Sequence, residues 1–105
     1  MAHRVSDEAQ AELDDIWYYV AKESGSERIA DRLIDQITRR FFMLAQHPHM
    51  GRKRDEDLRP GLRTFHVGSY IIVYRVEGND VLILLAVRGD RDLAVLLDEI
   101  WPSPT

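Results

Sequence analysis

The feature that most constrains the fold is a pair of apolar segments near the C-terminal end of the chain. Residues 70–76 read YIIVYRV, and residues 81–88 read VLILLAVR, with the turn-forming stretch Glu77-Gly78-Asn79-Asp80 between them. Both segments are rich in β-branched or other apolar residues and bring apolar side chains to both faces, which is typical of strands in the middle of a sheet. A third strand, residues 62–67, precedes the tight turn Gly68-Ser69. The sequence therefore predicts an antiparallel meander whose faces must be covered by other elements.

The first half of the chain supplies the cover as two amphipathic helices. Ser6 is the expected N-cap of the first, in which Ala9, Leu13 and Ile16 share one face. The opposite face, with Glu8, Glu12 and Asp15, is acidic. The second helix begins near a capping box formed by Ser24 and Glu27, or at the rival N-cap Ser26, and ends at His47-Pro48. The short linker predicts a helical hairpin.

Three further segments complete the expected order βααβββα. Residues 3–5 form an edge strand, residues 46–61 form a loop without apolar periodicity, and residues 93–101 form a short helix capped by Asp90 or Asp92. The chain is then one α+β domain spanning residues 1–105. Its N-terminal helical hairpin packs on a three- to four-stranded antiparallel sheet with a short C-terminal helix.

Composition excludes several classes of function. The chain has no cysteine, so disulfides and thiolate metal sites are excluded. Its longest apolar run has seven residues, far below the ~20 of a membrane helix. A net charge of −4 argues against general nucleic-acid binding, although residues 28–63 hold nine basic against five acidic side chains. We expect a cytoplasmic protein without a cofactor or a membrane partner.

Four segments, in order and with the expected spacing, resemble toxins of the ParE/RelE superfamily, most of all its ParE branch. They are SDEAQAELDDIWYYV (6–20), LAQHPHMGR (44–52), LRTFHVGSYIIVYR (62–75) and LAVRGDRDL (85–93). The resemblance implies a RelE/ParE-like fold and the toxin role of a bacterial type II toxin–antitoxin module, with growth arrest and plasmid stabilisation as its associated effects. The best-known members of the ParE branch poison DNA gyrase, whereas the RelE branch cleaves messenger RNA on the ribosome.

The residues favour binding over RNA cleavage. Metal-free cleavage needs a general base, a general acid and cations on the scissile phosphate. Ile71 stands where the RelE branch places an arginine, and no tyrosine, histidine or lysine follows Tyr74. If the chain is an enzyme, it is a messenger RNA endoribonuclease, and its only catalytic candidates, all weak, are His66, Arg63, Arg88 and Arg91. A guanidinium is a poor general base. His47 and His49 lack a third ligand, so no metal site is predicted.

Two binding surfaces are predicted. Cations near the sheet are expected to contact the target: Arg52, Arg54, Arg59, Arg63, Arg88 and Arg91. In a meander the first and third strands run in the same direction, so Arg88 should lie near Val67 rather than Arg63. A groove between the helical hairpin and the sheet should accept the antitoxin through Trp17, Arg39, Arg40, Tyr70 and Tyr74. The simpler interpretation of Tyr18, Tyr19, Tyr70 and Tyr74 is packing between the helices and the sheet.

The leading hypothesis is a ParE-like toxin that inhibits DNA gyrase by binding. A ParD-like antitoxin would neutralise it, with operator DNA contacted only through the antitoxin, in a heterotetramer or a larger complex. One alternative is a RelE-like, ribosome-dependent messenger RNA endonuclease. The other is an inactive toxin that acts only as a co-repressor with its antitoxin.

Overall fold

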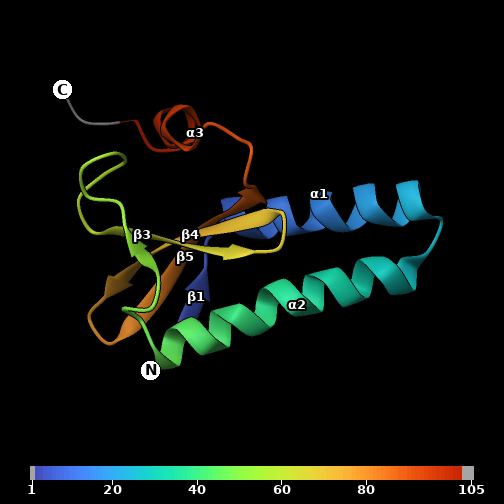
Figure 1. Cartoon of the computed structure of the whole chain (residues 1–105), viewed down its shortest axis with the longest axis horizontal. Helices are drawn as coiled ribbons and strands as arrows, with labels where there is room; N and C mark the ends of the chain where they lie inside the picture. The colour runs from blue at the N-terminus through green and yellow to red at the C-terminus, as the bar shows by residue number, and fades with distance from the viewer. Residues whose placement is uncertain (1, 103–105) are drawn as a thin grey trace.

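The computed structural model describes residues 2–102, which fold into three helices and five strands (Figure 1). In chain order the elements are β1 (His3–Val5), α1 (Asp7–Ser24), α2 (Glu27–Gln46), β2 (Arg52–Lys53), β3 (Leu62–Val67), β4 (Tyr70–Glu77), β5 (Asp80–Arg88) and α3 (Leu93–Ile100). The predicted helical hairpin, meander and C-terminal helix are confirmed. No helix among these residues is long and apolar enough to cross a membrane.

The sheet is larger and less uniform than predicted. Its strand order is β1-β5-β4-β3-β2, and β1 pairs in parallel with β5 while the other pairs are antiparallel. The predicted antiparallel sheet of three to four strands is therefore a mixed sheet of five. The additional strand β2 lies within residues 46–61, which were predicted to be a loop. It was missed because two charged residues carry no periodicity and pair only through their backbone.

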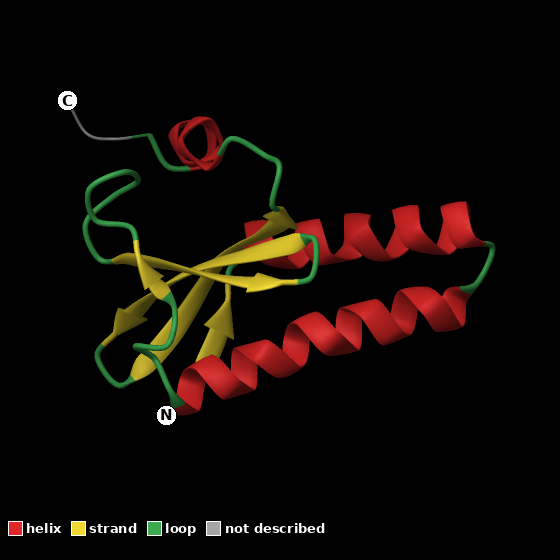
Figure 2. Ribbon diagram, in the orientation of Figure 1, coloured by secondary structure: helices red, strands yellow, loops and turns green. Residues whose placement is uncertain are grey.

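Each face of the sheet has its own apolar layer, with the sheet lying between the hairpin and α3 (Figure 2). The hairpin buries Leu13, Ile37 and Phe41 against Ile72 and the other residues of that face. On the opposite face α3 buries a leucine cluster, Leu93, Leu96 and Leu97, against the outward side chains of β3, β4 and β5. This double cover explains why β4 and β5 are apolar on both sides.

A β-bulge in β5 sets which face the end of that strand presents. Tyr74 lies opposite Ile83 and Val73 opposite Leu85, so Leu84 is an extra residue on β5. Leu84 and Leu85 consequently both join the cluster beneath α3, and Ala86 returns to the hairpin face. Because side chains alternate along a strand, the bulge turns Arg88 toward the hairpin face.

The helix ends resolve the alternatives left open by the sequence. Ser6 caps α1 by accepting from the Ala9 N–H, as predicted. Ser26, and not Ser24, caps α2, because Gly25 takes a left-handed φ of 69° that ends α1 before it. Asp92, and not Asp90, caps α3 through the Val95 N–H.

Tyr74 anchors the connection between α2 and β2. Its ring is fully buried, its hydroxyl donates to the Pro48 carbonyl (2.8 Å), and it accepts from the Gly51 N–H (2.9 Å). A Cβ at Gly51 would lie 2.9 Å from the Thr64 carbonyl oxygen and would collide with the Tyr74 hydroxyl. Only glycine fits this approach.

We expect Gly51→Ala to lower the free energy of unfolding by about 1–3 kcal/mol, because neither the buried ring nor the strand can yield without strain. Thermal unfolding followed by circular dichroism measures the effect. Gly89→Ala is the matched control, because its Cβ would have the Ser69 carbonyl oxygen, at 3.5 Å, as nearest neighbour. Equal stability of Gly51→Ala and the wild type would contradict the close contact with Tyr74.

Candidate functional site

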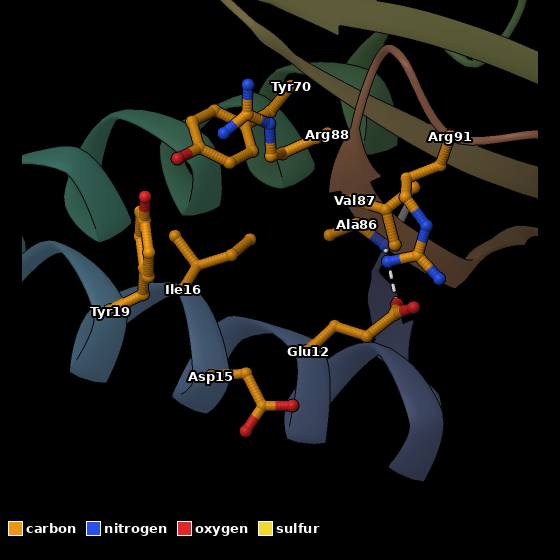
Figure 3. Close-up of a pocket in the computed structure, with 9 residues that line it drawn as sticks. All are labelled: Glu12, Asp15, Ile16, Tyr19, Tyr70, Ala86, Val87, Arg88 and Arg91. Atoms are coloured by element: carbon orange, nitrogen blue, oxygen red, sulfur yellow. Dashed lines mark hydrogen bonds between the residues drawn. The ribbon is translucent and has the colours of Figure 1, made fainter.

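A cleft of about 320 Å³ lies between α1 and the paired ends of β4 and β5 (Figure 3). One wall is formed by α1 and the other by the sheet and the turn that follows it. The lining residues are Glu12, Asp15, Ile16, Tyr19, Tyr70, Ala86, Val87, Arg88 and Arg91. The cleft thus joins acidic, aromatic and basic side chains from distant parts of the sequence.

Two arginines stand at the sheet side of this cleft. Arg88 is the last residue of β5 and lies directly opposite Tyr70 of β4, so the two side chains share one face. The Arg88 side chain is 57% exposed and reaches Asp90 only at 3.6 Å. Arg91 follows in the turn between β5 and α3. Its backbone N–H donates to the Arg88 carbonyl (3.2 Å), and this hydrogen bond holds the turn. A paired strand and a hydrogen-bonded turn therefore position both cations.

Glu12 faces these arginines from α1 and was missed by the sequence analysis, which placed it on the acidic outer face of the helix. Its carboxylate accepts the Ala86 N–H at 2.9 Å (Figure 3). Burial raises the pKa of Glu12 to about 7, although the Ala86 hydrogen bond and the charge of Arg91 oppose the rise. Glu12 follows Ala9 by three residues and precedes Ile16 by four, so the helical spacing already placed it at the margin of the buried face.

The other predicted target-binding arginines lie elsewhere and are largely occupied with structural contacts. Arg63 donates to the carbonyls of His49 (3.2 Å) and Gly51 (2.8 Å). Arg54 pairs with Asp57 at 2.7 Å, and Arg59 with Asp98 at 3.1 Å. Arg52 is exposed on β2.

These arginines lie apart from the cleft. Arg63 pairs with Tyr74, four residues along β4 from the partner of Arg88, which is about 13 Å of strand. The six arginines therefore do not form one patch.

The weak catalytic candidates do not form one cluster, although the His66 ring lies close to Gly89, the residue after Arg88. His66 lies opposite Ile71, whose side chain belongs to the face beneath α3, whereas Arg63 and Arg88 lie on the hairpin face. No proton-transfer pair is formed by His66, Arg63, Arg88 and Arg91. Within residues 2–102, no group of three His, Cys, Asp or Glu side chains is placed to hold a metal ion.

The residues predicted to bind an antitoxin are scattered. Trp17 donates its indole N–H to Asp31 at 2.7 Å and so ties α1 to α2. Arg39 and Arg40 are exposed on α2, and Tyr70 lines the cleft.

Two aromatic assignments need correction. Tyr74 is fully buried, so its predicted direct contact with an antitoxin is wrong for this fold. Tyr18 and Tyr19, interpreted from the sequence as packing residues, are 64% and 56% exposed, and Tyr19 lines the cleft.

Comparison with known proteins decides the family. Residues 4–94 match the family described as ParE toxin of the type II toxin–antitoxin system parDE. The chain belongs to the ParE toxin family.

Individual ParE relatives agree with this assignment. The chain is 38% identical to toxin ParE3 of Caulobacter vibrioides over 86 residues, which are 82% of this chain and 84% of the relative. It is 42% identical to toxin ParE1 of the same organism over 74 residues, or 70% and 75% of the two chains. A solved structure of a chromosomal ParDE system from P. aeruginosa superposes with a TM-score of 0.72 at 27% identity, covering 84% of this chain and 95% of that one. The fold predicted from the sequence is thus that of a ParE toxin.

The raised pKa of Glu12 predicts a stability that depends on pH. Because the folded-state pKa of about 7 exceeds the ordinary 4.5, the contribution of Glu12 is fully present below pH 4.5 and is lost as pH rises through 7. Glu12→Gln keeps an acceptor for the Ala86 N–H and removes the charge. We expect this variant to exceed the wild type by about 1–2 kcal/mol at pH 8, a value reduced for partial solvent exposure, and to match it at pH 4.

Urea unfolding at the two pH values measures this difference. Glu23→Gln removes an exposed carboxylate near the other end of α1 and serves as the control, with a pH dependence like that of the wild type. A Glu12→Gln variant that gains nothing at pH 8 would show that the carboxylate is well solvated.

Proposed function

We propose that this ParE-family toxin arrests growth by binding DNA gyrase and is held inactive by a ParD-like antitoxin. The observation that carries the proposal is the placement of Arg88 and Arg91 at the rigid end of β5, exposed at the mouth of a cleft. Fixed cations on a paired strand suit recognition of a partner surface, because little side-chain and backbone freedom is lost on docking. The proposal puts the toxin in the cytoplasm, together with gyrase.

The chemistry of the described residues supports binding over RNA cleavage. Arginine stays protonated at neutral pH and cannot take the proton of a 2′-hydroxyl. The one histidine near the end of the sheet, His66, projects from the face opposite that of Arg88. A nuclease mechanism would have to use Glu12 as the base beside these cations, and the Glu12 carboxylate is already engaged by the Ala86 N–H.

The antitoxin part of the proposal rests on the cleft and on the family. The structural neighbour from P. aeruginosa is described as a ParDE toxin–antitoxin system. In this chain the cleft brings an apolar floor and charged walls to the surface between hairpin and sheet, which suits a tail that folds on binding. We expect two toxins on an antitoxin dimer, and contact with operator DNA through the antitoxin alone.

Expression of the chain without its antitoxin tests the proposal. Filamentation with gyrase-linked DNA breaks supports gyrase as the target. Transcripts cleaved on ribosomes would overturn the proposal in favour of an endonuclease, and normal growth in the presence of soluble, folded protein would leave only a co-repressor role. Co-expression with the antitoxin should restore growth in the first case.

Arg88→Ala is expected to reduce toxicity by at least tenfold in the inducer concentration needed to stop growth, because it removes the exposed cation that faces Tyr70. Affinity for the antitoxin, measured by calorimetry, should fall by less than that factor. Arg32→Ala, an exposed arginine of α2, is the matched control and should remain fully toxic. Undiminished toxicity of Arg88→Ala would remove the end of β5 from the target-binding site.

A further inference from the structure

Beyond the end of β1, the outer edge of β5 is covered by side chains instead of a strand. The parallel pairing ends where Val5 meets Ile83, and the Ser6 N–H then donates to the Ile83 carbonyl (2.9 Å). After this point the Ser6 hydroxyl donates to the Leu84 carbonyl (2.9 Å), and the Glu12 carboxylate accepts from the Ala86 N–H (2.9 Å). Two side chains thus occupy positions where a neighbouring strand would place its backbone.

The remainder of this edge faces the cleft. The Gly89 N–H donates to the Ser69 carbonyl on the β4 side, so the N–H of Arg88, one residue earlier, is directed to the other side of the strand. The N–H groups of Ala86 and Arg88 therefore point the same way, about 6.8 Å apart along β5. This is the spacing at which an extended segment offers alternate carbonyl oxygens.

We propose that the edge of β5 at Ala86–Arg88 docks an extended, acidic segment of the antitoxin, and that Glu12 is a placeholder which this segment displaces. The inference rests on the proposed function, since it names how the antitoxin would occupy the cleft. On docking, a main-chain carbonyl of the segment takes the Ala86 N–H, and the Glu12 side chain moves toward solvent.

Charge in the cleft sets the acidic character of the segment. Arg91 is the cation that faces Glu12 from the turn after β5, and it lowers the pKa of that carboxyl. When Glu12 leaves, Arg91 loses this anion and Arg88 keeps only the distant Asp90. A carboxylate on the incoming segment restores the pairing and also favours rapid association.

Displacement of Glu12 couples docking to the release of a proton from the Glu12 carboxyl. The groups that face Glu12 are Glu8, Asp15 and Tyr19 on α1, Tyr70 and Arg88 on the sheet, and Arg91 in the turn. Burial of Glu12 outweighs the effects of these neighbouring groups and holds the pKa of its carboxyl near 7 in the free toxin. In solvent the carboxyl returns toward its ordinary value of 4.5, so docking near neutral pH releases a proton held by the free toxin. Affinity should therefore rise with pH between about 5 and 7.

Calorimetry with a peptide covering the C-terminal half of the antitoxin encoded beside this toxin tests the inference. For the wild type we expect Kd to be about five- to tenfold lower at pH 7.5 than at pH 6.0. Glu12→Gln should bind more weakly than the wild type at pH 7.5, since the neutral amide stays on the Ala86 N–H at every pH. Glu12→Ala should bind more tightly than the wild type at both pH values, and both variants should show no pH dependence from this residue.

Two controls separate the possible failures. Glu23→Gln should keep the pH dependence of the wild type, because Glu23 is exposed near the far end of α1 and lies outside the cleft. In the free toxin, the NMR shift of the Ala86 amide should titrate near pH 7 in the wild type and be flat in Glu12→Gln; in the complex the titration should vanish.

The outcomes distinguish this inference from the function on which it rests. Binding that is independent of pH and unchanged in both Glu12 variants would overturn the placeholder alone. An Ala86 amide that still senses the titration of Glu12 in the complex would do the same. A wild-type toxin that binds no antitoxin peptide and no full-length antitoxin at either pH would overturn the proposed neutralisation, and this inference with it.

Discussion

The central constraint on this protein is that β5 is enclosed on four sides. It pairs with β4 along one edge and with β1 along part of the other, and its two faces are covered by the helical hairpin and by α3. A strand held in this way can shift little, so the direction of its last side chains is determined by register. The bulge at Leu84 decides that register, since without the extra residue Arg88 would point toward α3 and away from the cleft.

The cleft exists because β1 is short and α1 begins directly after it. Had β1 continued, its backbone would have paired with Ala86 and closed the edge of β5. Instead α1 crosses there and supplies Glu12, whose carboxylate satisfies the Ala86 N–H in a poorly hydrated position. The same arrangement explains both the groove proposed for an antitoxin segment and the raised pKa of Glu12, the residue that occupies this groove.

The sequence determined the elements better than the site. Periodicity identified the hairpin, the three long strands and α3, because these elements bury whole faces and their apolar spacing records it. The sequence predicted β1 but not its partner strand, and it did not predict the two-residue β2. Short edge strands pair through backbone groups, and this pairing leaves no side-chain pattern. The bulge at Leu84 was equally hidden, because seven consecutive apolar residues look the same in either register.

The predictions for individual site residues were also limited, because the sequence pattern does not show which backbone or side chain each residue meets in the fold. Tyr74 is more deeply buried than a surface contact allows, and Tyr19 is more exposed than a packing residue, although both are tyrosines in amphipathic contexts. The separation of Arg88 from Arg63 could be predicted from the sequence, because the direction of the strands alone determines it. Glu12 was accessible in part: its helical spacing placed it at the margin of the buried face, but only the fold shows which backbone group it meets.

The most direct test of this account is an assay of supercoiling by purified DNA gyrase with added purified toxin, run beside a translation reaction that reports cleavage of messenger RNA. We predict that the toxin inhibits supercoiling in proportion to its concentration, that Arg88→Ala does so much less, and that the messenger RNA stays intact. Full supercoiling activity together with cleaved messenger RNA would contradict the account, because the arginines of the cleft would then act in catalysis, with Glu12 as their base, and not in binding gyrase.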